Sequence, residues 1–188
     1  MDGANGTRRL EWPPVIIPWD NNWEEYCQLI YSEYKKYYSQ NNPFYFDGMV
    51  VKARKRPIAL DKEGGFWHVI GGSEGVPEKE RCERVLWARA IIENYQDDSV
   101  LVWEEPSKHD GSTKDVVFWL KDENYYVILA KRDGYWVIRS AYYIKYESKK
   151  IKLQKAYELY GSYKTRIASK ADDSDPSFYD SVDELSLL

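Results

Sequence analysis

The chain has 188 residues, which suits one domain with a short appendage. Hydrophobic residues make up 43% and aromatic residues 16% of it, so a globular fold rich in Tyr and Trp contacts is expected. Two cysteines and two histidines are too few for a disulfide framework or a zinc cluster, and we expect no metal and no cofactor. No apolar run approaches the roughly 20 residues of a membrane span, and the first residues lack the apolar core of a signal peptide. We therefore expect a soluble protein in the reducing cytoplasm of a bacterial host cell, without membrane contact.

Charge is distributed unevenly along the chain. Its 27 basic and 31 acidic residues give a net charge of −4, but residues 171–188 hold six of the acids and no Lys or Arg. The rest of the chain therefore carries 27 positive and 25 negative charges, a balance of +2. Residues 131–170 contain eleven basic and three acidic residues, a local +8. A basic stretch next to an acidic tail indicates contact with nucleic acid more strongly than the net charge argues against it.

The first third of the sequence predicts an arm, a helix and a short strand. Residues 1–20 are punctuated by Gly, Pro and Asn, and they predict an irregular arm that packs on the body. A helix is expected over 22–39, because aromatic and aliphatic residues recur at helical spacing, and Pro43 prevents its continuation. Residues 49–51 predict a strand. The basic cluster after it is either a solvated edge or a phosphate contact, and consists of Lys52, Arg54, Lys55 and Arg56.

A strand at 66–70 and a long helix over 78–96 are the two elements on which the predicted site depends. The strand is aromatic and β-branched, and the helix begins after Pro77 with acids in its first turn. The glycine-rich loop 71–75 has no Gly-Lys-Ser/Thr after it, so it is interpreted as a connector and not as a phosphate-binding loop.

The remaining sequence predicts strands joined by tight turns and then a helix. Such short turns force successive strands to be antiparallel. The expected strands are 99–104, 116–120, 125–131 and 135–146, and the expected helix is 149–163. The predicted fold class is therefore α+β, with helices packed on a curved antiparallel sheet of about four strands. The expected organisation is an arm at 1–20, one domain at 21–165 and an acidic, flexible tail at 166–188.

His68 lies within the first of these two elements, and the strand prediction places it on one face with Phe66 and Ile70. An imidazole in an apolar row needs a polar partner. His68 is therefore either a hydrogen-bonded core histidine or a proton-transfer group suited to acid–base work near neutral pH.

Arg84 and Arg89 lie on or beside the apolar stripe of the predicted helix, where an arginine needs an anionic partner. That partner is either a buried acid such as Glu63 or Asp47, or a substrate phosphate, whose geometry an Arg fork matches.

Strand alternation places Ser140 and Tyr142 on one face of the last strand, and Arg139 and Ala141 on the other. The two hydroxyls are either an ordinary strand row or, together with His68 and the arginines, a phosphate site without a metal. No Ser-His-Asp motif, HExxH motif or carboxylate metal cluster competes for the role.

These stretches resemble phage- and plasmid-type members of the Barnase–EndoU–colicin–RelE ribonuclease superfamily. The resemblance lies in FWHVIGG, in RCERVLWARAIIEN and in the strand ending WVIRSAYYI, and it covers about residues 47–163. It implies a helical N-terminal region on a four-stranded antiparallel sheet. It also implies metal-independent RNA cleavage, in which the 2′-hydroxyl attacks the adjacent phosphate and leaves 2′,3′-cyclic phosphate and 5′-hydroxyl ends. By resemblance, His68 matches an early histidine, Arg84 and Arg89 match helix arginines, and Ser140 and Tyr142 match a Thr-Ala-Tyr-like element. The acidic tail departs from the family pattern.

The sequence therefore predicts an RNA endonuclease that acts as a toxin or as an effector in phage–host conflict. His68 is expected to be the general acid or base, and Arg84 and Arg89 to stabilise charge in the transition state. Ser140 and Tyr142 are expected to orient the phosphate or the nucleophile. The expected partners are tRNA or mRNA and an inhibitor or antitoxin protein. The residues expected to hold the RNA backbone are Lys131, Arg132, Lys145, Lys149, Lys150 and Lys152.

Two alternatives keep the same fold without catalysis. One is a binding protein of a phage–host conflict system, whose Tyr and Trp side chains form a protein interface. The other is an RNA-binding module that uses the basic stretch and aromatic stacking. Products that carry a cyclic phosphate would distinguish the nuclease from both. The acidic tail is also a candidate self-inhibitor of the basic surface.

Overall fold

An antiparallel meander of four strands forms the centre of the protein, as the sequence predicted. In this computed structural model, which describes residues 10–72, 75–108 and 113–172, each strand is rich in β-branched and aromatic residues. The strands are β5 (Val100–Pro106), β6 (Lys114–Leu120), β7 (Tyr125–Arg132) and β8 (Tyr135–Tyr143). They pair in sequence order, and the tight turns before β7 and β8 use the positive φ angles of Asn124 and Gly134.

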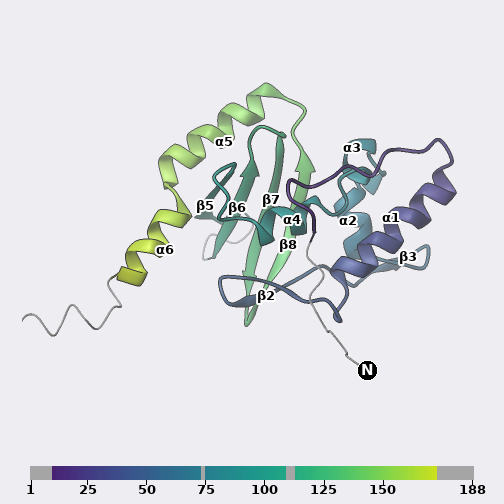
Figure 1. Ribbon diagram of the computed structural model, residues 1–188, viewed down its shortest axis with the longest axis horizontal. Helices are drawn as coiled ribbons and strands as arrows, with labels where there is room; N and C mark the ends of the chain where they lie inside the picture. The colour runs from purple at the N-terminus through teal and green to yellow at the C-terminus, as the bar shows by residue number, and fades with distance from the viewer. Residues whose placement is uncertain (1–9, 73–74, 109–112, 173–188) are drawn as a thin grey trace, which may run out of the picture.

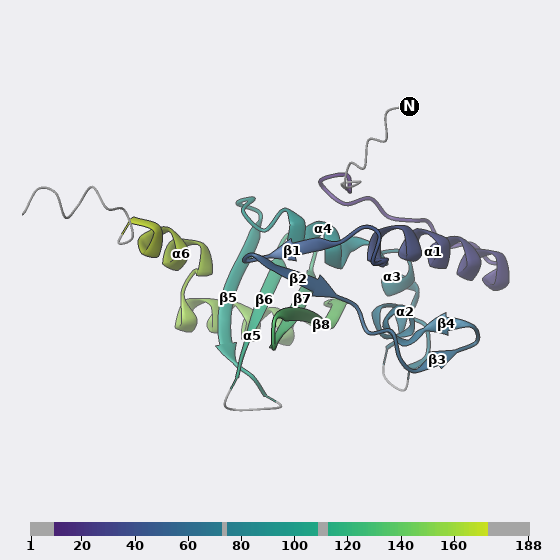
Figure 2. The ribbon, with the colours of Figure 1, turned by 90° about the horizontal axis from the view of Figure 1, so that it is seen from below.

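The sheet has six strands and not about four, because β1 (Phe44–Phe46) and β2 (Met49–Lys52) extend it beyond β8. The order is β1-β2-β8-β7-β6-β5, and β2 pairs in parallel with β8 through Val51 and Trp136. The sheet is therefore mixed and curved, with helices packed on it, which confirms the α+β class (Figures 1 and 2). Local sequence could not show this pairing, since β2 and β8 lie more than 80 residues apart.

Helix α1 (Trp23–Tyr38) confirms the first predicted helix. The side chain of Asn22 caps it by accepting a hydrogen bond from the backbone N–H of Glu25. Its buried residues include Ile30 and Tyr34, which pack against α2 in a core separate from the sheet. The arm before it also packs on the body, since the Trp87 indole donates to the carbonyl of Val15.

The predicted strand at 66–70 is wrong, because these residues form helix α2 (Gly64–Ile70). Phe66, Val69 and Ile70 are buried at helical spacing, and a run of seven residues is too short for its pattern to separate helix from strand. Gly65 lets α2 approach the chain before it, since its N–H donates to the carbonyl of Arg54 at 2.6 Å. A Cβ at Gly65 would lie 2.4 Å from that oxygen.

The predicted helix over 78–96 is also wrong as one element. The chain forms α3 (Lys79–Cys82), then tight turns, then α4 (Trp87–Glu93). The reason is that this segment serves two cores. Cys82 and Val85 pack with α1 and α2, whereas residues of α4 pack on the sheet, and one straight helix cannot face both directions.

Helix α5 (Glu147–Tyr160) covers the other face of the sheet, where Leu153 packs among residues of β5, β6 and β7. It ends at Gly161, whose φ of +72° turns the chain into α6 (Tyr163–Asp172). The predicted tail at 166–188 therefore begins inside a helix, and its residues 173–188 lie outside the described residues, as does the start of the predicted arm, 1–9. In the described part of the chain, no helix is long and apolar enough to cross a membrane.

Candidate functional site

A β-bulge in β8 organises a cavity with polar and charged walls on one face of the sheet. Ser140 pairs with Ile128 and Ile138 with Leu129, so Arg139 is an extra residue without a partner in β7. The bulge interrupts strand alternation. Arg139, Ser140 and Tyr142 consequently line one cavity under α5, while Ala141 faces the opposite core. The prediction that Ser140 and Tyr142 share a face is confirmed, and the prediction that Arg139 faces away from them is wrong.

Arg139 is held inside the cavity by an ion pair. One guanidinium nitrogen contacts the carboxylate of Asp115 on β6, and another donates to the hydroxyl of Ser107 at 2.8 Å. Asp115 is only 2% exposed, so its negative charge requires a positive partner. Arg139 therefore has a fixed direction within the cavity.

Two tyrosine hydroxyls meet in the same cavity. Tyr126 of β7 donates its hydroxyl to that of Tyr142, and their ring centres lie 4.1 Å apart in an edge-to-face arrangement. The guanidinium carbon of Arg81, from α3, lies 4.8 Å from the centre of the Tyr142 ring. Burial raises the pKa of Tyr142, although Arg81 opposes this, so the hydroxyl keeps its proton at neutral pH.

Lysines of α5 close the cavity, which has a volume of about 290 Å³. The ammonium group of Lys149 lies 4.7 Å from the ring centre of Tyr126. Burial lowers the pKa of Lys149, and the nearby charges of Lys108 and Lys152 lower it further, while Glu105 opposes the shift. Among the described lining residues there are four cations and two carboxylates, a balance of +2. The cations are Lys108, Arg139, Lys149 and Lys152, and the carboxylates are Glu105 and Asp115.

This arrangement is suited to a phosphate group. An excess of positive charge, a fixed Arg and hydroxyl donors are the groups that recognise phosphate oxygens. The volume is small for a whole nucleotide but large enough for a phosphate and part of a sugar. A lysine with a lowered pKa adds a group that can accept a proton.

His68 does not line this cavity, but it contacts the backbone of Arg139, which does. It lies on α2, and its Nε2 is 2.5 Å from the backbone carbonyl oxygen of Arg139. Since a carbonyl only accepts, Nε2 carries the proton and Nδ1 carries the lone pair. Burial lowers the pKa of His68, and the charges of Arg54 and Arg81 lower it further, while the hydrogen bond to the Arg139 carbonyl opposes the shift. The net shift is downward, so the ring is neutral at pH 7. The interpretation as a hydrogen-bonded histidine matches this position, although the strand assumed for it is wrong.

Arg84 lies on the opposite face of β8 from Tyr142. Its guanidinium carbon is 4.9 Å from the ring centres of both Trp87 and Tyr143, and one nitrogen donates to the carbonyl of Glu80. Tyr143 packs against the core on the α4 side of the sheet, whereas Tyr142 packs on the α5 side. The structure therefore does not bring Arg84 together with the two hydroxyls.

Arg89 is fully buried and joins α4 to the end of α1. It pairs with Glu93 at 2.7 Å and donates to the backbone carbonyls of Tyr37 and Asn42. The interpretation that a protein acid satisfies this arginine matches the structure, although the acid is Glu93 and neither Glu63 nor Asp47. The reason is local, because Glu93 lies one helical turn after Arg89.

The predicted RNA-binding residues do not lie on one surface. Lys131 and Arg132 are exposed beside the β7–β8 turn, at the end of the sheet away from α5 (Figure 1). Lys149 and Lys152 line the cavity, and Lys145 follows β8 and pairs with Glu80 at 3.1 Å. The remaining residue, Lys150, pairs with Glu147 on the far side of α5.

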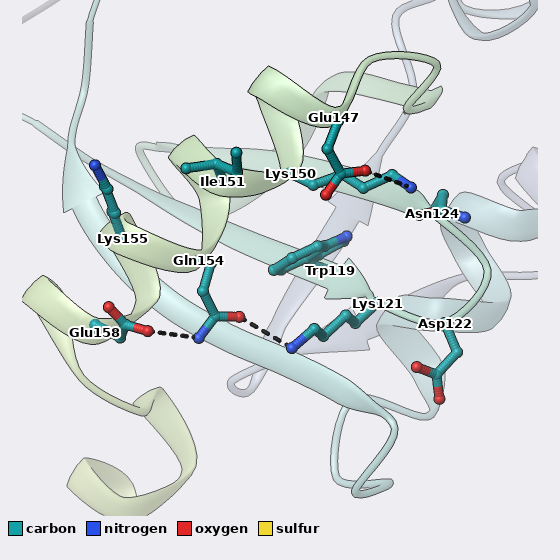
Figure 3. A pocket seen from close by; sticks show the side chains of 10 residues that line it. All are labelled: Trp119, Lys121, Asp122, Asn124, Glu147, Lys150, Ile151, Gln154, Lys155 and Glu158. Carbon is teal, nitrogen blue, oxygen red and sulfur yellow. Dashed lines mark hydrogen bonds and ion pairs between the residues drawn. The ribbon is translucent and has the colours of Figure 1, made fainter.

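That far side holds a second groove, of about 620 Å³, above Trp119 (Figure 3). One wall is a hydrogen-bonded chain in which Lys121 donates to Gln154 and Gln154 donates to Glu158. Its lining contains three lysines and three acids, so it has no charge excess. The groove is therefore a weaker candidate for an anion-binding site than the cavity beneath α5.

Four polar residues that line the cavity were not singled out by the sequence, namely Glu105, Lys108, Asp115 and Tyr126. Neither was Arg81, which lies over the ring of Tyr142. A charged residue in the strand KDVVFWL was the one available signal, since Asp115 begins a row that is otherwise apolar. Among the described residues, no group of three or more His, Cys, Asp or Glu side chains could hold a metal ion.

Comparison with known proteins returned no matching family model, no matching curated protein and no matching solved structure. The resemblance to the ribonuclease superfamily therefore stays a prediction, and the function has to be argued from the cavity.

Replacing Arg89 should destabilise the fold without acting on chemistry. Arg89→Met should lower the free energy of unfolding by about 3 kcal/mol, because it leaves Glu93 and two partly buried carbonyls without their partner. Urea denaturation measures this, with Arg132→Met as a control that should change stability by less than about 0.5 kcal/mol. Wild-type stability in Arg89→Met would contradict the structural role.

His68 should make stability depend on pH. The unfolded chain takes up a proton near the ordinary value of 6.5, whereas the folded chain resists it because the pKa of His68 is lowered. The unfolded state thus binds more protons as pH falls below 6.5, and the folded state loses stability. Denaturation midpoints between pH 7.5 and 5 should fall less steeply in His68→Gln than in the wild type. Equal slopes would show that His68 is not buried as described.

Proposed function

We propose that the protein is a metal-independent endoribonuclease that binds the phosphate to be cleaved in the cavity beneath α5. The observation that carries this proposal is the convergence of Arg139, the hydroxyls of Tyr126 and Tyr142, and Lys149 at one small, positively charged cavity. Phosphodiester cleavage by a neighbouring 2′-hydroxyl requires little more than positioning, charge stabilisation, a proton acceptor and a proton donor. The cavity offers one group for each requirement.

Each group takes a role that its surroundings favour. Lys149 in its neutral form accepts the proton of the 2′-hydroxyl, since burial and two neighbouring lysines lower its pKa. The 2′-oxygen attacks phosphorus, and the bond from phosphorus to the 5′-oxygen breaks. Tyr142 donates a proton to the leaving 5′-oxygen, because its raised pKa keeps it protonated. Arg139 stabilises the negative charge that gathers on the phosphate oxygens.

This proposal reassigns the residues expected from the sequence. Tyr142 and Ser140 remain at the phosphate, Arg139 replaces Arg84 and Arg89, and Lys149 replaces the histidine as proton acceptor. His68 becomes a positioning residue, because it holds the backbone of the residue that contacts the phosphate.

A non-catalytic RNA-binding factor is the second candidate. It is favoured by the contact of Asp115 with Arg139, which neutralises part of the charge that a transition state would need. A role in phage–host conflict is compatible with both candidates. Toxicity, and an inhibitor or antitoxin partner, belong to the first, because uncontrolled RNA cleavage harms the cell.

Replacing Lys149 separates the two candidates. Lys149→Arg keeps the positive charge but removes the proton acceptor, so the cleavage rate should fall at least about 100-fold while RNA affinity stays within about twofold. The rate is measured on tRNA and mRNA with EDTA present, and the products are mapped for 2′,3′-cyclic phosphate ends. Lys155→Arg is the matched control, because Lys155 lies on the same helix but lines the groove above Trp119. This variant should cleave RNA at the wild-type rate. Binding by the wild type without any cyclic phosphate would establish the second candidate.

The pH profile tests the role of Lys149 independently. Only the neutral amine accepts a proton, so the cleavage rate should rise with pH until Lys149 has lost its proton. That rise should level off below the ordinary lysine value of 10.5, because burial lowers the pKa. A rate that falls as pH rises through the neutral range would contradict the assignment.

A further inference from the structure

A strained hairpin presents an apolar side chain at the opposite end of the molecule from α6. Strands β3 (Ile58–Ala59) and β4 (Lys62–Glu63) are joined by Leu60 and Asp61, with φ angles of +48° and +59°. Such two-residue turns favour Asn-Gly, and a branched apolar residue is strained there. The side chain of Leu60 is nonetheless 79% exposed. Strain of this kind persists where it serves a contact, and the described fold makes no use of Leu60.

The hairpin forms one wall of a groove of about 680 Å³ with α1 and α2. The indole of Trp67 fixes the hairpin by donating to the carbonyl of Ala59 at 2.7 Å. The apolar lining is provided chiefly by Trp23, Leu60, Trp67 and Val76. This is an exposed apolar patch of the type that marks a protein interface.

Charge on the groove is of one sign. Arg54 and Arg56 line it and are exposed, and none of the lining residues is acidic. Within the described part of the chain, neither arginine has an ion pair. The complementary ligand is therefore a segment that combines aliphatic side chains with carboxylates and carries no Lys or Arg.

The sequence itself contains a segment of this chemistry. Residues 173–188 hold five acids and no Lys or Arg. Its apolar residues are Phe178, Tyr179, Val182, Leu185, Leu187 and Leu188. We propose that this segment of one copy of the chain binds the hairpin groove of a second copy.

The arrangement of the elements is the reason for placing the contact between copies. Both views show α6, which leads into this segment, and the β3–β4 hairpin at opposite ends of the molecule (Figures 1 and 2). The contact joins two different surfaces, so it is heterologous, and repeating it produces a ring or a chain of copies. It does not involve the cavity beneath α5 and does not rest on the proposed function.

A protein segment fits the groove better than RNA does. The exposed aliphatic side chains of Leu60 and Val76 need an apolar partner, which a protein segment supplies and RNA does not. The rings of Trp23 and Trp67 in the same groove are nevertheless surfaces on which bases can stack. RNA binding to the groove is therefore the competing outcome of the test.

Charge reversal in the full-length chain tests the contact. The groove variant carries Arg54→Glu and Arg56→Glu, and the segment variant carries Asp180→Lys, Asp183→Lys and Glu184→Lys. Sedimentation over a concentration series should show association of the wild type and loss of it in each variant alone. A mixture of the two variants should associate again, because each reversed surface meets its opposite charge.

Controls make the result specific. Lys131→Glu with Arg132→Glu reverses two exposed charges away from the groove and should leave association unchanged. Leu60→Asp should abolish association while both arginines stay in place, because it removes the exposed apolar side chain of the groove. Circular dichroism checks that each variant is folded. A wild type that stays monomeric at all concentrations, or a mixture that stays monomeric, overturns the proposal. Single-stranded RNA binding that is lost in the groove variant, with no association in the mixture, would assign the groove to RNA.

Discussion

The ion pair between Arg139 and Asp115 is the interaction on which the candidate site depends. Asp115 is buried within the sheet, where an unpaired carboxylate would cost several kcal/mol, of the order of 3–5 if its partner were removed. Arg139 can reach it because the bulge adds one residue to β8 and turns that side chain toward α5. The same residue receives a hydrogen bond from His68 through its backbone. One position thus connects the helical region around α2 with the cavity beneath α5.

The two faces of the sheet differ in polarity. The face that packs on α4 is apolar and carries the main core, in which Trp87, Phe118 and Ile138 meet. The face beneath α5 has a smaller apolar cluster around Leu153 and leaves room beside it for charged groups. A cavity with buried charges is costly in free energy, and the larger core on the other face offsets that cost.

Sequence patterns predicted the parts of the fold that are determined locally. The meander, α1 and most of α5 follow from periodicity and turn residues, and so does the shared face of Ser140 and Tyr142. The strand proposed around His68 was wrong because so short and mostly apolar a run suits a buried helix equally well.

The candidate site could not be predicted in full, because its geometry depends on contacts between distant residues. A bulge shows no local signature, and it reverses the direction of Arg139. Arg89 pairs with Glu93 one helical turn later, which the sequence spacing allows. The pair is covered, however, by the loop after α1, whose Asn42 carbonyl accepts a hydrogen bond from Arg89. The pKa of Lys149 is lowered chiefly by its burial against the sheet and further by the charge of Lys108, and neither effect can be read from the spacing of residues in α5.

The central claim is that the cavity beneath α5 holds an RNA phosphate. A crystal structure of the protein with a short single-stranded RNA, made uncleavable by 2′-O-methyl groups, tests this most directly. We expect a phosphate group between the guanidinium of Arg139 and the side-chain nitrogen of Lys149, within hydrogen-bonding distance of the Tyr142 hydroxyl. RNA bound only at the basic cluster Lys52–Arg56, with the cavity free of phosphate, would contradict it.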